Sequence, residues 1–189
     1  MENRPLNIPV ILGTARKGRR SAHAARFVVA QLSREPGVVT ELIDIAGLNL
    51  AVDDAGEAIK DPGFAAKMSR ADGLVIVSPE YNHSFPGLLK HTLDTCLSEY
   101  IHKAVGVVGV SAGTFGGTRV IQGLLPVLRE LGLVTIFWDV NFGSVAKVFS
   151  ETGELKEPAF VQRTDKFIKE LIWMAETLRH GREQIALRS

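Results

Sequence analysis

The chain has 189 residues, 46% of them hydrophobic, and its 22 basic residues nearly balance 21 acidic ones. This size and composition predict a single domain, residues 1–189, with a sizeable apolar core. A formal net charge of +1 provides no overall attraction to nucleic acid or to an anionic membrane, so we expect neither as a partner.

Cysteine content and the length of the apolar runs bear on the cellular compartment. Cys96 is the only cysteine, so no disulfide can form within the chain, as is typical of a reducing compartment. No apolar run approaches the roughly 20 residues that span a bilayer, and the first residues lack the apolar stretch of a secretion signal. We therefore expect a cytoplasmic protein.

Short runs rich in β-branched residues alternate along the chain with stretches of helical periodicity. The predicted strands are residues 7–13, 38–45, 73–78, 104–111 and 133–138. Apolar residues at steps of three or four predict helices at residues 21–33, 118–131 and 158–180. Because strand and helix alternate, we expect right-handed crossovers and a doubly wound, three-layer α/β/α domain around a parallel sheet.

Three loops rich in glycine, proline and hydroxyl residues follow the first, third and fourth predicted strands. They are residues 13–21, 78–87 and 111–117. The carboxyl ends of parallel strands meet at one edge of a sheet, which is where open α/β domains bind ligands. We therefore expect these three loops to enclose one pocket.

The first loop has the chemistry of an anion site. Thr14 and Ser21 carry hydroxyl donors, and Arg16 can form charge-assisted hydrogen bonds. A helix is predicted to begin at the end of this loop, and a helix N-terminus offers free N–H groups and a partial positive charge. The loop is therefore suited to a terminal monophosphate, although a basic surface turn without a ligand remains the alternative.

Two common phosphate-binding motifs fail in this loop. Gly13 and Gly18 have the spacing of a Walker loop, but Arg19 and Arg20 stand where that motif has its lysine and its Ser or Thr. Ala15 stands where the dinucleotide fingerprint has its second glycine. The sequence thus favours neither nucleotide hydrolysis nor a dinucleotide fold.

The second and third loops suit a flat heterocycle. Tyr81 and Phe85 supply apolar faces, while Asn82 supplies a polar group. In the third loop, Gly113 and Gly116 remove side chains where a planar ligand would press on the backbone. The alternative is that these glycines serve only tight strand-to-helix turns.

At these residues the chain resembles the NADPH-dependent FMN reductase family, the flavodoxin-like flavoproteins that include quinone, chromate and azo-dye reductases. The matching segments are Gly13–Arg16 with Ser21, Ser78–Lys90 with Asp94, and Ser111–Gly113 with Gly116–Arg119. The resemblance implies a five-stranded parallel sheet of order 2-1-3-4-5 with FMN at its switch point. It also implies hydride transfer from NADPH or NADH through bound FMN to a quinone, flavin, azo compound or chromate.

The resemblance also assigns residues to the parts of FMN. Those implied to hold the phosphate are Thr14, Arg16 and Ser21, helped by Arg19 or Arg20. Those implied to border the isoalloxazine are Pro79, Glu80, Tyr81 and Asn82 on one side, and Ser111, Gly113 and Gly116 on the other. A homodimer or homotetramer is implied as well.

The flavin itself carries hydride transfer, so we expect no catalytic side chain. The five histidines show no metal-ligand spacing, and we expect no metal. Two alternatives stay open: a flavodoxin-type electron carrier without its own substrate, which the net charge of +1 does not favour, and a flavin-free regulatory α/β domain.

Overall fold

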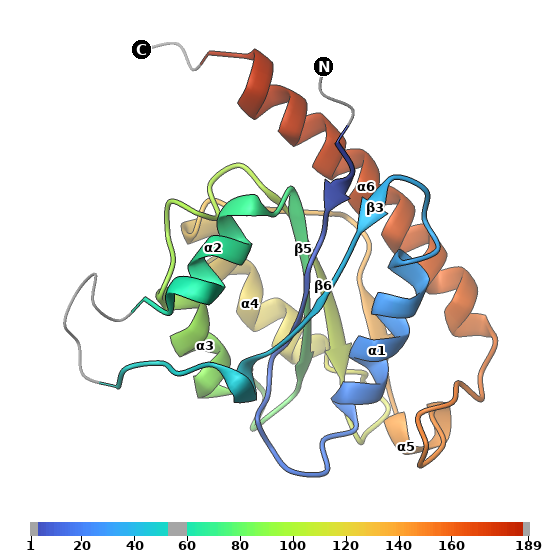
Figure 1. Cartoon of the computed structure of the whole chain (residues 1–189). Coiled ribbons are helices and arrows are strands. Elements are labelled where there is room, and N and C mark those ends of the chain that lie inside the picture. Colours follow the sequence, from blue (N-terminus) through green and yellow to red (C-terminus); the bar gives the residue numbers. More distant parts are fainter. Residues whose placement is uncertain (1–3, 53–59, 187–189) are drawn as a thin grey trace.

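A computed structural model of the chain describes residues 4–52 and 60–186 (Figure 1). The strands of its central sheet lie in the order β4 (Leu42–Asp44), β2 (Val10–Leu12), β5 (Gly73–Pro79), β6 (Ala104–Val110) and β7 (Val134–Thr135). A further strand, β8 (Val140–Phe142), pairs with β6, and β1 (Leu6–Asn7) pairs with β3 (Val38–Val39). All of these pairings are parallel, which confirms the predicted α/β class.

The first and second predicted strands are each divided into two pieces, because Pro9 lacks the N–H that a regular ladder needs. Hydrogen bonds nevertheless continue across the break. The N–H of Ile8 donates to the carbonyl of Val39 over 2.9 Å, and the N–H of Val10 donates to that of Glu41 over 2.8 Å. When β1 is joined to β2, and β3 to β4, the sheet has the flavodoxin-like order 2-1-3-4-5.

The fifth predicted strand, residues 133–138, is wrong in its second half. The chain leaves the sheet after β7, and Phe137 and Trp138 are 79% and 44% exposed. The N–H of Phe137 donates to Glu170 Oε1 over 3.0 Å instead of to β6. The strand resumes as β8, beside the carboxyl half of β6.

Helices cover both faces of the sheet and give the three layers seen in Figure 1. On one face lie α1 (Ser21–Leu32) and α6 (Ala159–Gln184), and on the other lie α2 (Pro62–Arg70), α3 (Gly87–Asp94) and α4 (Thr118–Glu130). Two short elements complete the fold: the 3₁₀ turn η1 (Ile45–Gly47) and the helix α5 (Val145–Val148). In the described part of the chain, no helix combines the length and apolarity that a membrane span requires.

Each central strand contributes to both apolar layers. Val75 belongs to the cluster under α1 and α6, whereas Ile76 belongs to the cluster under α2, α3 and α4. This period of two explains why the run is almost continuously apolar. On the α6 side, a Cβ at Gly106 of β6 would collide with the ring of Phe167, so the glycine lets α6 lie close to the sheet.

Asp72 ties the amino-terminal residues to α6 at the edge opposite the three loops. Its carboxylate is 1% exposed and accepts hydrogen bonds from Arg4 Nη1 and Nη2 at 2.7 and 2.8 Å. Arg182 Nη2 lies 3.3 Å away and Arg179 Nη1 3.7 Å away. Burial acts to raise the pKa of Asp72, but the hydrogen bonds from Arg4 and from the N–H of Asn7 outweigh it and lower the pKa.

Candidate functional site

The three loops predicted to form one pocket do line a common cavity of about 290 Å³. The first loop and the start of α1 supply Arg16, Gly18, Arg19, Arg20 and Ser21; the second supplies Pro79, Glu80 and Tyr81; and Val110, Ser111, Ala112 and Val145 complete the wall. Of the predicted site residues, the cavity therefore brings together Arg16, Arg19, Ser21, Pro79, Glu80, Tyr81 and Ser111. The other four, Thr14, Asn82, Gly113 and Gly116, do not line it.

The first loop leaves β2 through a close approach to its neighbours. The N–H of Gly13 donates to the carbonyl of Val77 over 2.8 Å and extends the pairing with β5. A Cβ at Gly13 would lie 2.8 Å from Leu89 Cδ2 on α3, so the Leu89 side chain would have to shift to make room for it. Glycine thus lets the loop begin at the carboxyl end of the sheet and turn toward α1.

The start of α1 has a buried hydroxyl without a hydrogen-bond partner beside the cavity. Arg20, at the N-cap, makes no side-chain hydrogen bond to the helix backbone. Ser21 is 3% exposed, and its Oγ has no hydrogen-bond partner among the residues that the structure describes. Buried hydroxyls in folded proteins are nearly always hydrogen-bonded. An anion at this end of the cavity would satisfy the hydroxyl, whereas the N–H groups of Ala22 and His23 already donate to the carbonyls of Arg19 and Arg20 over 3.3 and 3.0 Å.

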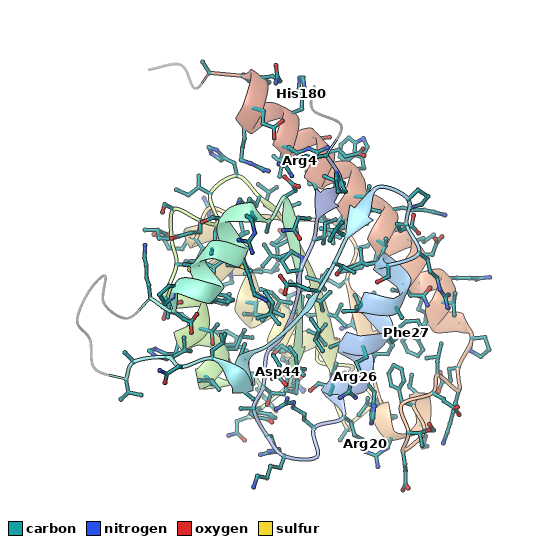
Figure 2. The ribbon with its side chains drawn as sticks, viewed as in Figure 1. Arg4, Arg20, Arg26, Phe27, Asp44 and His180 are labelled. Carbon is teal, nitrogen blue, oxygen red and sulfur yellow. The ribbon has the colours of Figure 1, made fainter. Side chains whose placement is uncertain are left out.

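The arginines of the first loop differ in their partners. Arg19 forms an ion pair with Asp44 at the end of β4, and this carboxylate neutralises its charge. The guanidinium of Arg16 lies over the Tyr81 ring, 4.5 Å from the centroid. Within the described ranges, neither Arg16 nor Arg20 forms an ion pair. Figure 2 shows Arg20 and Asp44 at the same end of the molecule.

The second loop is a tight hairpin turn that directs Tyr81 toward the first loop. The N–H and carbonyl of Tyr81 pair with those of Ser84 over 2.8 and 2.9 Å. Between them, Asn82 and His83 both have positive φ, 49° and 64°, as a two-residue turn of this type requires. Both are exposed at the tip of the turn, away from the cavity wall.

The hydroxyl of Thr14 lies 2.9 Å from Tyr81 Oη and joins the first loop to the second. Thr14 is 1% exposed, and its Oγ1 also accepts a hydrogen bond from the N–H of Arg16 over 3.4 Å. Its hydroxyl is therefore already occupied in holding Tyr81 and the turn of the first loop.

Glu80 links the second loop to α4 and leaves one oxygen unused. Its Oε1 accepts a hydrogen bond from Arg119 Nη1 of α4 over 3.0 Å. Its Oε2 is buried and has no hydrogen-bond partner in the described part of the chain. Sequence reasoning gave Arg119 no role in the site, because nothing in its spacing indicates a partner 39 residues away.

The glycines of the third loop have different surroundings. A Cβ at Gly113 would meet no atom within 4 Å, so this residue borders open space. Gly116 has φ +62°, and a Cβ there would lie 2.7 Å from Asn141 Cβ on β8. Gly116 therefore allows the third loop to pack on the sheet, whereas the sequence interpretation had it make room for a planar ligand.

Metal and thiol chemistry have little support in this structure. No group of three His, Cys, Asp or Glu side chains with the geometry of a metal site occurs among the described residues. Cys96 is 2% exposed, and burial raises the pKa of its thiol to about 11. A thiol that is buried and protonated is a poor nucleophile.

Comparison with known proteins gives consistent matches. Residues 6–146 match the family described as NADPH-dependent FMN reductase. The chain is 32% identical over 158 residues to an NADPH azoreductase of Bacillus sp. (strain OY1-2), covering 81% of this chain and 85% of that one. It is 31% identical over 159 residues to a quinone reductase of Escherichia coli (strain K12), covering 79% and 85%.

Among solved structures, FerB, a flavoenzyme NAD(P)H:(acceptor) oxidoreductase from Paracoccus denitrificans, is similar with a TM-score of 0.76 and 20% identity, covering 91% of this chain and 98% of that one. A flavodoxin from the domain Archaea gives a TM-score of 0.59 at 10% identity, covering 93% and 100%. At these identities the structural matches support the flavodoxin-like fold alone.

Proposed function

Because the chain belongs to the NADPH-dependent FMN reductase family and is accordingly an FMN-dependent NAD(P)H oxidoreductase, we propose that the cavity between its three loops holds the FMN and that a quinone or a similar small molecule is its acceptor. The flavin supplies hydride transfer when it is bound. The side chains of the protein bind the flavin, orient it and restrict access to it.

The observation that carries this proposal is a pair of buried, unsatisfied polar atoms that belong to residues lining one cavity. Ser21 Oγ is a donor at the start of α1, and Glu80 Oε2 is an acceptor on the second loop. A phosphate would accept from the first, and the imide N–H of a flavin ring would donate to the second. The residues present therefore fit FMN at both its charged and its aromatic end.

The geometry divides the proposed cofactor residues into two groups. Ser21, Arg16 and Arg20 are proposed to contact the phosphate, since their donors are not used by a carboxylate. The residues proposed to border the ring are Pro79, Glu80, Tyr81 and Ser111, with Gly113 on the open side and Asn82 at the tip of its turn.

Three further predicted residues are proposed to act through their neighbours. Thr14 positions Tyr81 through its hydroxyl, and Arg19 holds the first loop against Asp44. Gly116 allows the third loop to pack on β8. All three are proposed to belong to the site as residues that position the loops.

An anaerobic absorbance experiment tests the function. Protein loaded with FMN and mixed with NADPH or NADH under nitrogen should lose its oxidised-flavin absorbance, and benzoquinone added afterwards should restore it. Unchanged flavin absorbance with both nucleotides would refute the proposal. Bleaching without steady-state turnover on any quinone would favour a flavodoxin-type carrier, and protein that fails to take up FMN would favour a regulatory domain.

We further propose that residues 1–189 form one FMN-binding domain and that the protein works in the cytoplasm as a homodimer or homotetramer. The assembly is what the resemblance to this family implies. Light scattering during gel filtration measures the mass directly, and a monomer at all concentrations tested would contradict the expected assembly.

A further inference from the structure

A second hollow adjoins the proposed FMN cavity on the outer side of the first loop. It has a volume of about 570 Å³ and lies between the start of α1 and the segment that follows α5. Its lining residues are Ala15, Arg16, Lys17, Gly18, Arg19, Arg20, Ala22, His23, Arg26 and Glu151. Four of them, Arg16, Gly18, Arg19 and Arg20, also line the FMN cavity, so the two spaces meet at the first loop.

The hollow carries excess positive charge. Five of its lining side chains are Arg or Lys, against the single carboxylate of Glu151. Asp44 neutralises Arg19, so three positive charges remain. The described residues give no ion-pair partner to Lys17, Arg20 or Arg26. A dianionic FMN phosphate therefore leaves part of this charge uncompensated.

The FMN phosphate is expected beside the hollow and not inside it. Ser21 Oγ, the buried donor without a partner, lines the FMN cavity but not the hollow. Lys17, His23 and Arg26 line the hollow but not the FMN cavity. Each space therefore has donors that the other lacks, while Arg16, Arg19 and Arg20 border both.

One wall of the hollow is ordered by packing. A Cβ at Gly153 would lie 2.5 Å from His23 Nδ1, so the glycine makes room for the imidazole. The His23 ring lies 6.2 Å from that of Phe149. Burial, together with the charges of Arg26 and Arg20, lowers the pKa of His23. The imidazole thus lies in the positive field of Arg26, which is on α1, and of Arg20, which precedes it; both are labelled in Figure 2.

We infer that this hollow receives the 2′-phosphate of NADPH and that Arg26, with Lys17 and Arg20, distinguishes NADPH from NADH. The inference rests on the proposed function, because it assigns a place to the co-substrate of that reaction. A phosphomonoester carries close to two negative charges near neutral pH and is matched by arginine and lysine donors. NADH has a hydroxyl at the same position and gains nothing from this charge.

Arg26→Gln tests the inference, and Arg34→Gln is the matched control. Both arginines are exposed, but Arg34 lies beyond the carboxyl end of α1, far along the helix from the hollow. Steady-state kinetics with a quinone should show kcat/KM for NADPH falling on the order of 10-fold in Arg26→Gln, mainly through KM. The value for NADH should stay unchanged, and Arg34→Gln should match the wild type with both nucleotides.

Binding provides a second readout that does not depend on turnover. By calorimetry, the FMN-loaded protein should bind adenosine 2′,5′-bisphosphate more tightly than adenosine 5′-monophosphate, and Arg26→Gln should abolish this preference. Equal losses with NADPH and NADH, or no loss with either, would overturn the inference.

A third outcome would also overturn it: weakened FMN retention in Arg26→Gln would assign the hollow to the FMN phosphate. If the wild type oxidises neither nucleotide, the proposed function fails. The bisphosphate preference and its dependence on Arg26 then still decide whether the hollow binds a phosphomonoester.

Discussion

Replacing Ser21 by alanine is expected to change two measured quantities in opposite directions. The residue is 3% exposed, and its hydroxyl is buried without a hydrogen-bond partner among the described residues. In FMN-free protein it is therefore a desolvated donor without compensation, which is unfavourable. With FMN bound, the same hydroxyl should donate to a charged phosphate oxygen.

Both magnitudes follow from this environment. A hydrogen bond to a charged group contributes about 1.5–3 kcal/mol, so FMN should dissociate from Ser21→Ala with a Kd raised on the order of 10- to 100-fold. In the FMN-free protein, removing the unsatisfied hydroxyl and improving the helix propensity should raise the free energy of unfolding by about 1 kcal/mol. For a domain of this size that is a rise in Tm of about 2–4 °C.

Quenching of FMN fluorescence measures the Kd, and thermal unfolding of the FMN-free protein measures the stability. Ser33→Ala is the matched control, because Ser33 Oγ is exposed and donates to the carbonyl of Val29 over 2.9 Å. It should leave the FMN affinity unchanged. If Ser21→Ala destabilised the FMN-free protein and kept wild-type FMN affinity, the hydroxyl would be structural and the reasoning would be refuted.

Three further substitutions test the loops and the opposite edge of the sheet. Tyr81→Phe removes the hydrogen bond to Thr14 Oγ1 and should lower the free energy of unfolding by about 1 kcal/mol. A denaturant titration measures this change, and an unchanged midpoint would show that the hydrogen bond contributes nothing to stability. Gly116→Val should destabilise the fold by at least about 1–2 kcal/mol, because φ is +62° and the Cβ would meet Asn141. Gly113→Ala, the control, should remain as stable as the wild type. Equal stability of the two variants would contradict the packing described. Asp72→Asn should cost about 2 kcal/mol or more at pH 7, with Asp165→Asn of the exposed Lys169 pair as a nearly neutral control. Because the folded-state pKa of Asp72 is lowered, its contribution to the free energy of unfolding is fully present above the unfolded-state pKa of about 3.9. That contribution is lost as the pH falls through the folded-state pKa. A difference in the free energy of unfolding between wild type and Asp72→Asn that does not shrink in acid would argue against the ion pairs.

The sequence was sufficient to place the pocket because the relevant elements are the most regular ones. β5 and β6 are apolar on both faces, which predicts central parallel strands. Parallel strands bring their carboxyl ends together whatever their side chains are, so the loops after β2, β5 and β6 had to meet. This topology is why seven of the predicted site residues line one cavity.

The features that the sequence did not predict depend on contacts between distant segments. Arg19 is 25 residues from Asp44, and their pairing depends on β4 lying beside β2. The surroundings of Gly116 are set by Asn141 on β8, a strand that the sequence did not predict. The predicted fifth strand instead included Phe137 and Trp138, which have high β-propensity but lie in an exposed turn. Spacing along the chain contains no information about such neighbours.

The long helix α6 has a consequence for how this protein is made. Phe160, Phe167 and Leu171 of this helix complete the apolar layer over Val75 and Val108, and no other described segment after α1 covers that face so extensively. On a translating ribosome, α6 emerges after every strand of the central sheet, so the nascent chain exposes an uncovered apolar face until α6 has been synthesised. A polypeptide truncated before α6 should therefore be held by chaperones or degraded, and the three loops, although already synthesised, become a stable pocket only when α6 packs.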